Sequence, residues 1–354
     1  MKTFTIAVIA GDGVGTEVIP QGKRVLEAVA KKHDLNFAFQ DFDWGADHFL
    51  RWGRMMPAGA IDLLQPCDAI YLGAVGHPQI PDHTTLNGLL LPIRRAFDLY
   101  ANVRPAYLYP GVGSPLAGRN GGEIDLVVVR ENTEGEYAQV GGFVYQHQPE
   151  EVAVQTSVFT RRGIERVVSY AFELAVKRGK KKRVTSVTKS NAQGYSMVLW
   201  DRTFQEVAAH FPDVRTESLL VDAAAMNFVR RPESFDVVVA SNLFGDILSD
   251  LAAGLVGSMG LAASANLDPE RRFPSMFEPV HGSAPDIAGK GIVNPLAAIL
   301  TAALMLEHLE ESAAAREVEG AVAAVLAAGK VRTPDLGGDS TTEEVTEAVL
   351  EKLA

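Results

Sequence analysis

The stretch S-N-L-F-G-D-I-L-S-D-L-A-A-G-L-V-G-S, residues 241–258, combines an apolar helical pattern with two aspartates placed four positions apart. At about 100° per residue the helix carries one apolar stripe, formed by Leu243, Ile247 and Leu251. Asp246 and Asp250 fall together on the edge of this stripe and not on the opposite, solvent side. We therefore expect both carboxylates to face a crevice. The alternative is a pair of acids in the first helical turn, near a cap such as Asn242.

The composition indicates a soluble globular protein with room for two lobes. The chain has 354 residues, of which 47 % are hydrophobic and 22 % charged, so it can bury a large core. No basic segment followed by an apolar run opens the sequence, and the longest apolar run, 295–306, is too short to span a bilayer. The single cysteine, Cys67, excludes an internal disulfide. These features predict a cytoplasmic protein without a membrane segment, and the net charge of −11 argues against a nucleic-acid partner.

Short β-rich runs alternate with helical patterns along most of the chain. The β-rich runs are T-I-A-V-I-A (5–10), D-A-I-Y-L-G-A-V (68–75), D-L-V-V-V-R (125–130), V-T-S-V-T (184–188) and D-V-V-V-A-S (236–241), and early helices are expected over 17–31 and 86–99. Such alternation is typical of an α/β protein with a largely parallel sheet. The helical end, 295–309 and 312–328, is expected to pack on the first lobe. The basic cluster 177–183 is interpreted as a solvated turn.

The segment G-D-G-V-G-T-E, residues 11–17, follows the first predicted strand but does not fit the dinucleotide fingerprint. The third glycine of G-x-G-x-x-G would fall at Thr16, and no acidic residue ends a clear second strand at the expected distance. Gly11, Gly13 and Gly15 instead indicate a tight turn from strand to helix, which can also line a ligand.

Several charged and polar side chains lie where α/β proteins place ligand sites. The arginines are Arg94 on a predicted helix, Arg104 in N-V-R-P, and Arg130 at the end of a predicted strand. Three guanidinium groups together would bind one end of a small di-acid, and the alternative for each is a surface or ion-paired arginine. Asp222 lies in an apolar run and needs a partner cation or hydrogen bonds. With Asp246 and Asp250 it would supply three oxygen ligands, which suit Mg²⁺ or Mn²⁺.

Five motifs, in this order and spacing, make the chain similar to the β-decarboxylating dehydrogenases, which act on isocitrate, isopropylmalate, homoisocitrate, tartrate and D-malate. The motifs are G-D-G-V-G (11–15), R-E-N-T-E-G-E-Y (130–137), T-K-S-N (188–191), N-L-F-G-D-I-L-S-D (242–250) and E-P-V-H-G-S-A-P-D-I-A-G-K (278–290). The resemblance covers residues 6–342. It implies a two-lobed α/β fold like that of isopropylmalate dehydrogenase, with a mixed, largely parallel sheet that is not a Rossmann fold. The implied lobes are 1–99 plus 252–354, which binds the cofactor, and 100–251, which carries a dimerisation arm and helices.

The resemblance also implies a role for each candidate residue. Tyr137 protonates the enol and Lys189, from the partner subunit, is the base at the hydroxyl. The implied substrate-binding residues are Arg94, Arg104, Arg130, Leu90 and Leu91, and the implied metal ligands are Asp246, Asp250 and the partner's Asp222. The implied cofactor-binding residues are His281, Gly282, Ser283, Ala284, Pro285, Asp286, Ile287 and Asn294. The expected cofactors are NAD and Mg²⁺ or Mn²⁺, with a role for K⁺ left open.

Within this family the sequence favours a homodimeric enzyme acting on D-malate, tartrate or both. V-G-H-P-Q-I-P-D-H (75–83), T-K-S-N-A-Q (188–193) and F-P-S-M-F-E-P (273–279) are most similar to that branch, and 3-isopropylmalate dehydrogenase is the alternative. At Asn87 the branch usually has Trp and isopropylmalate enzymes have Glu, so this position favours neither. Leu90 and Leu91 could form an apolar pocket for an isopropyl group. A catalytically silent regulatory subunit and a dehydrogenase without CO₂ loss are the alternatives from other classes.

Overall fold

The computed structural model describes residues 1–354, which form two compact units. Unit 1 comprises Met1–Leu99, Arg104–Ile124 and Ala252–Ala354, and unit 2 comprises Tyr100–Val103 and Asp125–Leu251. Residues 104–124 belong to unit 1 in the structure, whereas the resemblance had assigned them to the second lobe. This segment approaches helix α11 (Ser312–Ala328) so closely that a Cβ on Gly111 would lie 2.2 Å from the carbonyl oxygen of Leu326.

Unit 1 is built on five strands in the order β2-β1-β3-β12-β11. Their bounds are β1 Lys2–Gly11, β2 Leu35–Asp41, β3 Ala69–Ala74, β11 Ala263–Leu267 and β12 Ser275–Pro279. Every pair is parallel except β11 with β12. Strand β4 (Ala101–Tyr107) begins in unit 2 and ends in unit 1.

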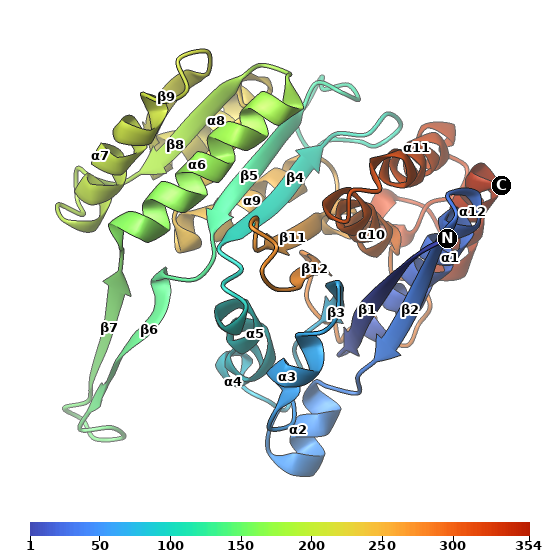
Figure 1. Ribbon diagram of the computed structural model, residues 1–354, viewed down its shortest axis with the longest axis horizontal. Coiled ribbons are helices and arrows are strands. Elements are labelled where there is room, and N and C mark those ends of the chain that lie inside the picture. Colours follow the sequence, from blue (N-terminus) through green and yellow to red (C-terminus); the bar gives the residue numbers. More distant parts are fainter. The chain divides into compact units, whose positions relative to one another are not determined.

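The helices of unit 1 include the chain's C-terminal segment. They are α1 Gly15–Lys32, α2 Ala46–Trp52, α3 Ala60–Leu64, α4 Asp82–Thr85, α5 Leu91–Ala96, α10 Leu296–His308, α11 and α12 Thr342–Leu353, with a π-helical turn over Leu86–Leu90. Because α10 contacts α1, α11, β11 and β12, it is buried on almost all sides. Both chain ends lie in this unit, near α12 (Figure 1). The helix predicted over 86–99 is thus two shorter segments, which end at Ala96.

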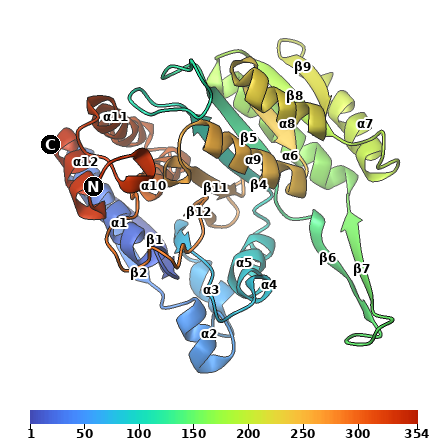
Figure 2. The same ribbon diagram turned by 180° about the vertical axis from the view of Figure 1, so that it is seen from behind.

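Unit 2 has four parallel strands in the order β5-β10-β8-β9. They are β5 Asp125–Glu131, β8 Arg183–Thr188, β9 Arg215–Leu220 and β10 Val237–Ala240. Helices α6 (Arg161–Arg178) and α7 (Ser196–Ala208) lie on one face of the sheet (Figure 1). Helices α8 (Val221–Arg230) and α9 (Asn242–Leu255) lie on the other (Figure 2). The predicted turn at 177–183 connects α6 to β8, but several of its cations bind protein groups, for example Lys180 with Asp125.

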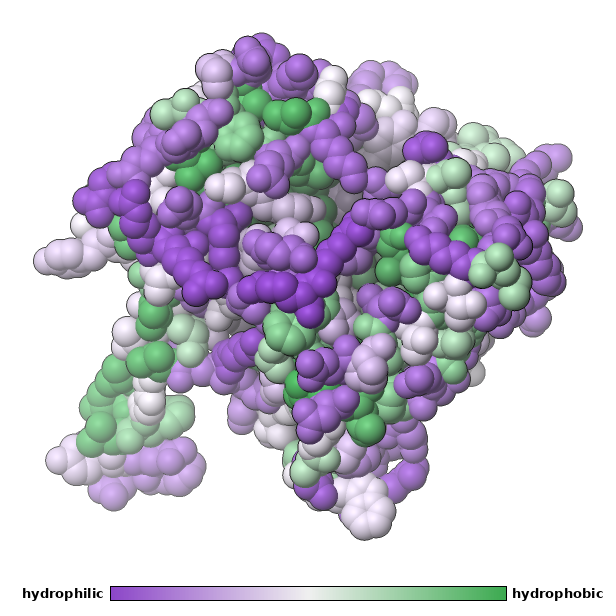
Figure 3. Space-filling model, viewed as in Figure 1, coloured by the Kyte–Doolittle hydropathy of each residue, from purple (hydrophilic) through white to green (hydrophobic).

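A two-stranded antiparallel ribbon, β6 (Gly135–Val144) with β7 (Val152–Val158), extends from the rest of unit 2 (Figure 1). Hydrophobic side chains are exposed along it, as Figure 3 shows. They include Val140, Phe143, Val144, Val152 and Val154. Since Phe143 and Val144 point to opposite faces of a strand, the ribbon presents apolar groups on both faces. An isolated hairpin of this kind is marginally stable in water, so the ribbon needs apolar cover.

None of the helices in this fold combines the length and apolar composition required to cross a lipid bilayer.

Candidate functional site

The candidate residues of unit 2 gather at one edge of its sheet. Arg130 is the penultimate residue of β5, Lys189 follows β8, Asp222 follows β9, and α9 begins one residue after β10. Because these four strands are parallel, their carboxyl ends lie at the same edge. Ligand sites of open α/β sheets form at this edge. The alternation of strands and helices therefore explains why residues distant in sequence share one region.

The R-E-N-T-E-G-E-Y motif contacts helix α9 at Asp246. Arg130 Nη1 forms an ion pair with Asp246, and the Tyr137 hydroxyl donates to the other carboxylate oxygen of Asp246 at 2.9 Å. The Arg130 guanidinium also donates to Asn242 Oδ1 from Nη2, at 2.7 Å, and stands 5.2 Å from the centre of the Tyr137 ring. Gly245 makes this packing possible, because a Cβ there would lie 2.6 Å from the Cβ of Arg130. A carboxylate, a guanidinium and a phenol thus converge within unit 2.

The apolar stripe predicted for α9 is not the face of the helix that is buried. Ile247 is 56 % exposed, whereas Phe244 and Leu248 are buried. Two apolar rows lie side by side on this helix, and the row of Phe244, Leu248 and Leu255 is the buried one, so the spacing alone could not identify which row meets the core. Asp246 is half-buried and Asp250 exposed, one turn apart on the same helix.

Lys189 and Asp222 lie together within one chain. The Lys189 ammonium donates to Asp222 Oδ1 at 2.9 Å, and this hydrogen bond holds the pKa of the Asp222 carboxyl below its ordinary value. Asp222 is exposed at the start of α8, although the sequence places it in an apolar run. No group of three or more histidine, cysteine or acidic side chains in the chain is arranged to hold a metal ion. Within one chain, Asp222 therefore lies with Lys189 and not with the two aspartates of α9.

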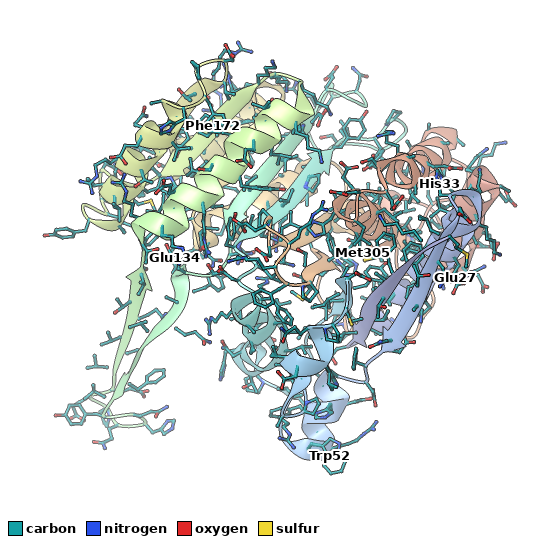
Figure 4. The ribbon with its side chains drawn as sticks, viewed as in Figure 1. Glu27, His33, Trp52, Glu134, Phe172 and Met305 are labelled. Atoms are coloured by element: carbon teal, nitrogen blue, oxygen red, sulfur yellow. The ribbon has the colours of Figure 1, made fainter.

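Two glutamates of the same motif stabilise its backbone. Glu131 is buried and accepts hydrogen bonds from the backbone N–H groups of Thr133 and Glu134, at 2.9 and 3.0 Å. Burial raises the pKa of Glu131 to about 7. Glu134 lies where the β6–β7 ribbon leaves the unit (Figure 4), and it accepts hydrogen bonds from the backbone and hydroxyl of Thr160, the N-cap of α6. Glu131 thus stabilises the backbone that follows β5, whereas the Glu134 side chain binds the start of α6.

The two candidate arginines of unit 1 are buried. Arg94 donates to Glu278 Oε1 at 2.7 Å, and Asn266 donates to the same oxygen at 2.8 Å. Arg104, on β4, is 8 % exposed. Neither arginine is therefore a surface residue. Arg94 does form an ion pair, which was the other alternative to substrate binding.

Leu90 and Leu91 are buried at the junction of the π-helical turn and α5. Leu90 packs in the hydrophobic core beside Met55 and Ile93. Asn87, on the π-helical turn, donates to the His83 carbonyl at 2.6 Å.

The strand-to-helix turn at Gly11–Gly15 is present and contacts the predicted cofactor loop. Val14 N–H donates to the Ser283 carbonyl at 2.9 Å. Gly13 has φ +51°, and a Cβ there would lie 2.1 Å from the same oxygen. Asp12 is buried in the turn, and its carboxylate accepts hydrogen bonds from Ala46 N–H at 2.6 Å and Gly76 N–H at 2.9 Å. The carboxyl ends of β1, β3 and β12 are thereby tied together.

A mostly apolar cavity of about 330 Å³ lies beside this turn in unit 1. Four predicted cofactor-binding residues line it, namely His281, Ala284, Ile287 and Asn294, together with Val14. Burial lowers the pKa of the His281 imidazole below its ordinary value, so the ring is neutral at neutral pH. Its Nε2 atom is buried without a hydrogen-bond partner. A flat heteroaromatic ring with polar edge atoms would fit this cavity.

The remaining predicted cofactor residues lie around the cavity. Gly282, Ser283 and Pro285 line a second, more open cavity of about 650 Å³ with the segment 75–82. Asp286 is exposed on the surface beside Ile287. The first cavity is completed by residues that the sequence did not reveal, namely Ser258, Met259, Gly260, Ile292, Val293, Pro334 and Asp335. Asp335 accepts from Asn294 at 3.0 Å, and only the fold shows this contact, since 41 positions separate the two residues.

The donor groups fit both predicted cofactors. An adenine ring would find apolar walls and the unsatisfied His281 Nε2 in the first cavity. Asp246 and Asp250 offer carboxylate oxygens from one helical face, the ligand type that Mg²⁺ and Mn²⁺ prefer.

Comparison with known proteins shows similarity over the whole chain. The sequence model described as "Isocitrate/isopropylmalate dehydrogenase" matches residues 5–349. A tartrate dehydrogenase/decarboxylase of Pseudomonas putida is 51 % identical over 360 residues, covering 99 % of this chain and 98 % of that protein. A decarboxylating D-malate dehydrogenase of Escherichia coli (strain K12) is 49 % identical over 356 residues, covering 99 % and 98 %. The crystal structure of isocitrate dehydrogenase from Methylococcus capsulatus superposes with a TM-score of 0.89 at 37 % identity, covering 99 % of both chains.

Proposed function

The chain belongs to the isocitrate/isopropylmalate dehydrogenase family and is a decarboxylating oxidoreductase, and on this premise we propose that it converts D-malate to pyruvate and CO₂ with NAD and a divalent metal ion. Tartrate is its second proposed substrate. The observation that carries the proposal is the convergence of Arg130, Tyr137 and Asp246 within unit 2. Relatives named for tartrate and D-malate are about half identical over the full chain, which supports these two acids.

The reaction begins with loss of a proton from the substrate hydroxyl and of a hydride from the same carbon. We assign Lys189 as the base that takes the proton, which requires its free amine form. NAD⁺, when bound, accepts the hydride, and the loop from His281 to Ile287, with Asn294, would hold its adenosine half. A divalent ion held by Asp246 and Asp250, with Asp222 of the partner subunit, would supply Lewis-acid stabilisation of the C2 oxygen.

The second half of the reaction releases CO₂ from the oxidised acid and leaves an enolate. Arg94, Arg104 and Arg130 are proposed to bind the carboxylate that leaves, because guanidinium groups pair with carboxylates through two parallel hydrogen bonds. Tyr137 is proposed to donate its proton to the C3 carbon of the enolate, which gives pyruvate. The hydrogen bond from Tyr137 to Asp246 is consistent with this role, because it orients the phenol.

The placement of Lys189 and Asp222 supports the proposal of a homodimer with shared sites. The two residues contact each other on the exposed start of α8, which is suited to presenting both to another subunit. Exposed apolar groups suit the same interface: the β6–β7 ribbon, and Met226, Val229 and Ile247 on α8 and α9. Burying them would remove apolar surface from water, at about 25 cal/mol per Å².

A panel of hydroxy di-acids tests the substrate assignment. Purified protein, freed of metal with EDTA and supplied with Mn²⁺ and NAD, is offered D-malate, tartrate and 3-isopropylmalate, with NADH and CO₂ both measured. We expect D-malate to have the highest kcat/KM and activity to depend on restored Mn²⁺. A preference of tenfold or more for 3-isopropylmalate, about 1.4 kcal/mol of transition-state binding, would reassign the enzyme to that substrate. NADH formation without CO₂ would indicate a plain dehydrogenase, and no turnover of any acid would favour a regulatory subunit.

A further inference from the structure

Glu136, the residue before Tyr137, binds the start of helix α9. Its Oε1 accepts the Ser241 hydroxyl at 2.9 Å, and its Oε2 accepts the Leu243 backbone N–H at 3.1 Å. The first N–H groups of any helix lack partners within the helix, and an anion there also interacts favourably with the helix dipole. Glu136 thus caps α9 from a different strand, although it lies 105 positions before Ser241.

The surrounding contacts fix the same helical turn against β6. The Asn242 side-chain amide donates to the Glu134 carbonyl at 3.1 Å, so residues 241, 242 and 243 each bind the root of β6. Gly135 allows this approach, since it has φ +72° and a Cβ there would lie 3.3 Å from the Asn242 Cβ. The next turn of the helix carries Asp246, which accepts the hydrogen bond from Tyr137.

We propose that Glu136 is a positioning residue, which sets the register between Tyr137 on β6 and the carboxylates of α9. This inference rests on the proposed function, because it assigns Glu136 to the geometry of that reaction. The carboxylate of Glu136 binds Ser241 and Leu243, and not Asp246 or Asp250. It acts through the first turn of α9: when the cap is removed, this turn frays, and Asp246 and Asp250 lose their fixed orientation.

Glu134 offers a matched control in the same motif. Its carboxylate caps α6 through Thr160, and α6 carries none of the residues assigned to the reaction. Its contact with Asn242 uses the backbone carbonyl and survives a side-chain change. Replacing Glu136 by alanine therefore removes a cap of α9, whereas replacing Glu134 by alanine removes the carboxylate that holds Thr160, the N-cap of α6.

The test compares Glu136→Ala, Glu136→Gln and Glu134→Ala in the full-length protein. Hydrogen exchange of the backbone amides reports each cap directly, and Mn²⁺ affinity in the absence of substrate reports the carboxylates of α9. We expect faster exchange at 243–246 and about tenfold weaker Mn²⁺ binding in Glu136→Ala, the size seen when groups that orient metal ligands are lost. Glu136→Gln keeps one acceptor for Leu243 and should recover most of the affinity. Glu134→Ala should speed exchange at the start of α6 and leave Mn²⁺ binding unchanged.

The outcomes separate this inference from the proposed function. Wild-type affinity for Mn²⁺ in Glu136→Ala, or an equal loss in Glu134→Ala, would overturn the positioning role and leave the function intact. Absence of Mn²⁺ binding by the wild-type protein would refute the metal-dependent function, and the positioning role with it. A lower kcat in Glu136→Ala with nearly unchanged KM for NAD would support the positioning role, since the cofactor loop lies in unit 1.

Discussion

Substitution of Gly13 by alanine should detach the strand-to-helix turn from the cofactor loop. The new Cβ would stand 2.1 Å from the Ser283 carbonyl oxygen, whereas ordinary contact begins at 3.4 Å. This oxygen belongs to the backbone and accepts the hydrogen bond from Val14, so it cannot move without breaking that bond. The left-handed backbone at Gly13 adds about 1 kcal/mol of strain, the lost hydrogen bond about 1 kcal/mol, and overpacking about 1–3 kcal/mol. We expect a total loss of about 3 kcal/mol or more.

Gly53→Ala is the matched control for this substitution. Gly53 also has a positive φ, +69°, but no atom lies within 4 Å of the position that its new Cβ would take. It should lose only the backbone term of about 1 kcal/mol, which lowers Tm by about 2–4 °C in a unit of this size. Gly13→Ala should lower Tm about three times as much and weaken NADH binding, followed by fluorescence, at least about tenfold. Equal Tm values for the two variants, with NADH affinity intact, would refute the idea that this close approach holds the cofactor loop.

Three further changes have definite expected results. Burial raises the pKa of Glu131 from 4.5 to about 7, so its contribution to stability is complete below about pH 4.5 and is lost as pH rises through about 7. Glu131→Gln should remove this pH dependence of the unfolding free energy, which amounts to roughly 3 kcal/mol in urea unfolding between about pH 5 and about pH 8. An unchanged slope would contradict the assignment. Mixing inactive Lys189→Ala and Tyr137→Phe subunits should restore part of the activity, whereas no recovery after confirmed subunit exchange would exclude shared sites. The unmodified enzyme should prefer NAD, because Asp286 would accept a hydrogen bond from the ribose 2′-hydroxyl and would repel a 2′-phosphate. The double variant Asp286→Lys with Ile287→Tyr should shift the ratio of the kcat/KM values for the two cofactors toward NADP, and an unchanged ratio would contradict this role of Asp286.

The family and the fold class were predictable from sequence because motifs mark strand ends. R-E-N-T-E-G-E-Y and T-K-S-N follow apolar runs, and both runs are strands of the sheet in unit 2. The glycine turn at residues 11–15 was correctly separated from a dinucleotide fingerprint, and family membership is confirmed by the match over residues 5–349. The functional roles of the individual residues stay predictions.

The features that sequence could not predict depend on tertiary contacts. The buried side of α9 was misassigned because two neighbouring apolar rows fit the same helical period, and only tertiary packing shows that the row of Phe244 and Leu248 is buried. Asp335 could not be identified, since its partner Asn294 is 41 residues away and its own surroundings resemble an ordinary turn. Glu136 was equally hidden, because a cap supplied by another strand follows none of the local capping patterns.

The interrupted course of unit 1 along the chain bears on how the protein is made. Strand β3 pairs with β12, and Ala69 is in register with Ser275, so this pairing must wait until some two hundred further residues have been synthesised. Unit 2 is nearly continuous and can fold while the ribosome is still translating, whereas the apolar strand β3 lacks its partner β12 for roughly ten to forty seconds. Completion comes last, when Lys32 of α1 donates to the Leu353 carbonyl near the end of the chain, at 2.7 Å. The N-terminal third of a nascent chain of this protein therefore exposes an unpaired edge of β3 until β12 has been synthesised.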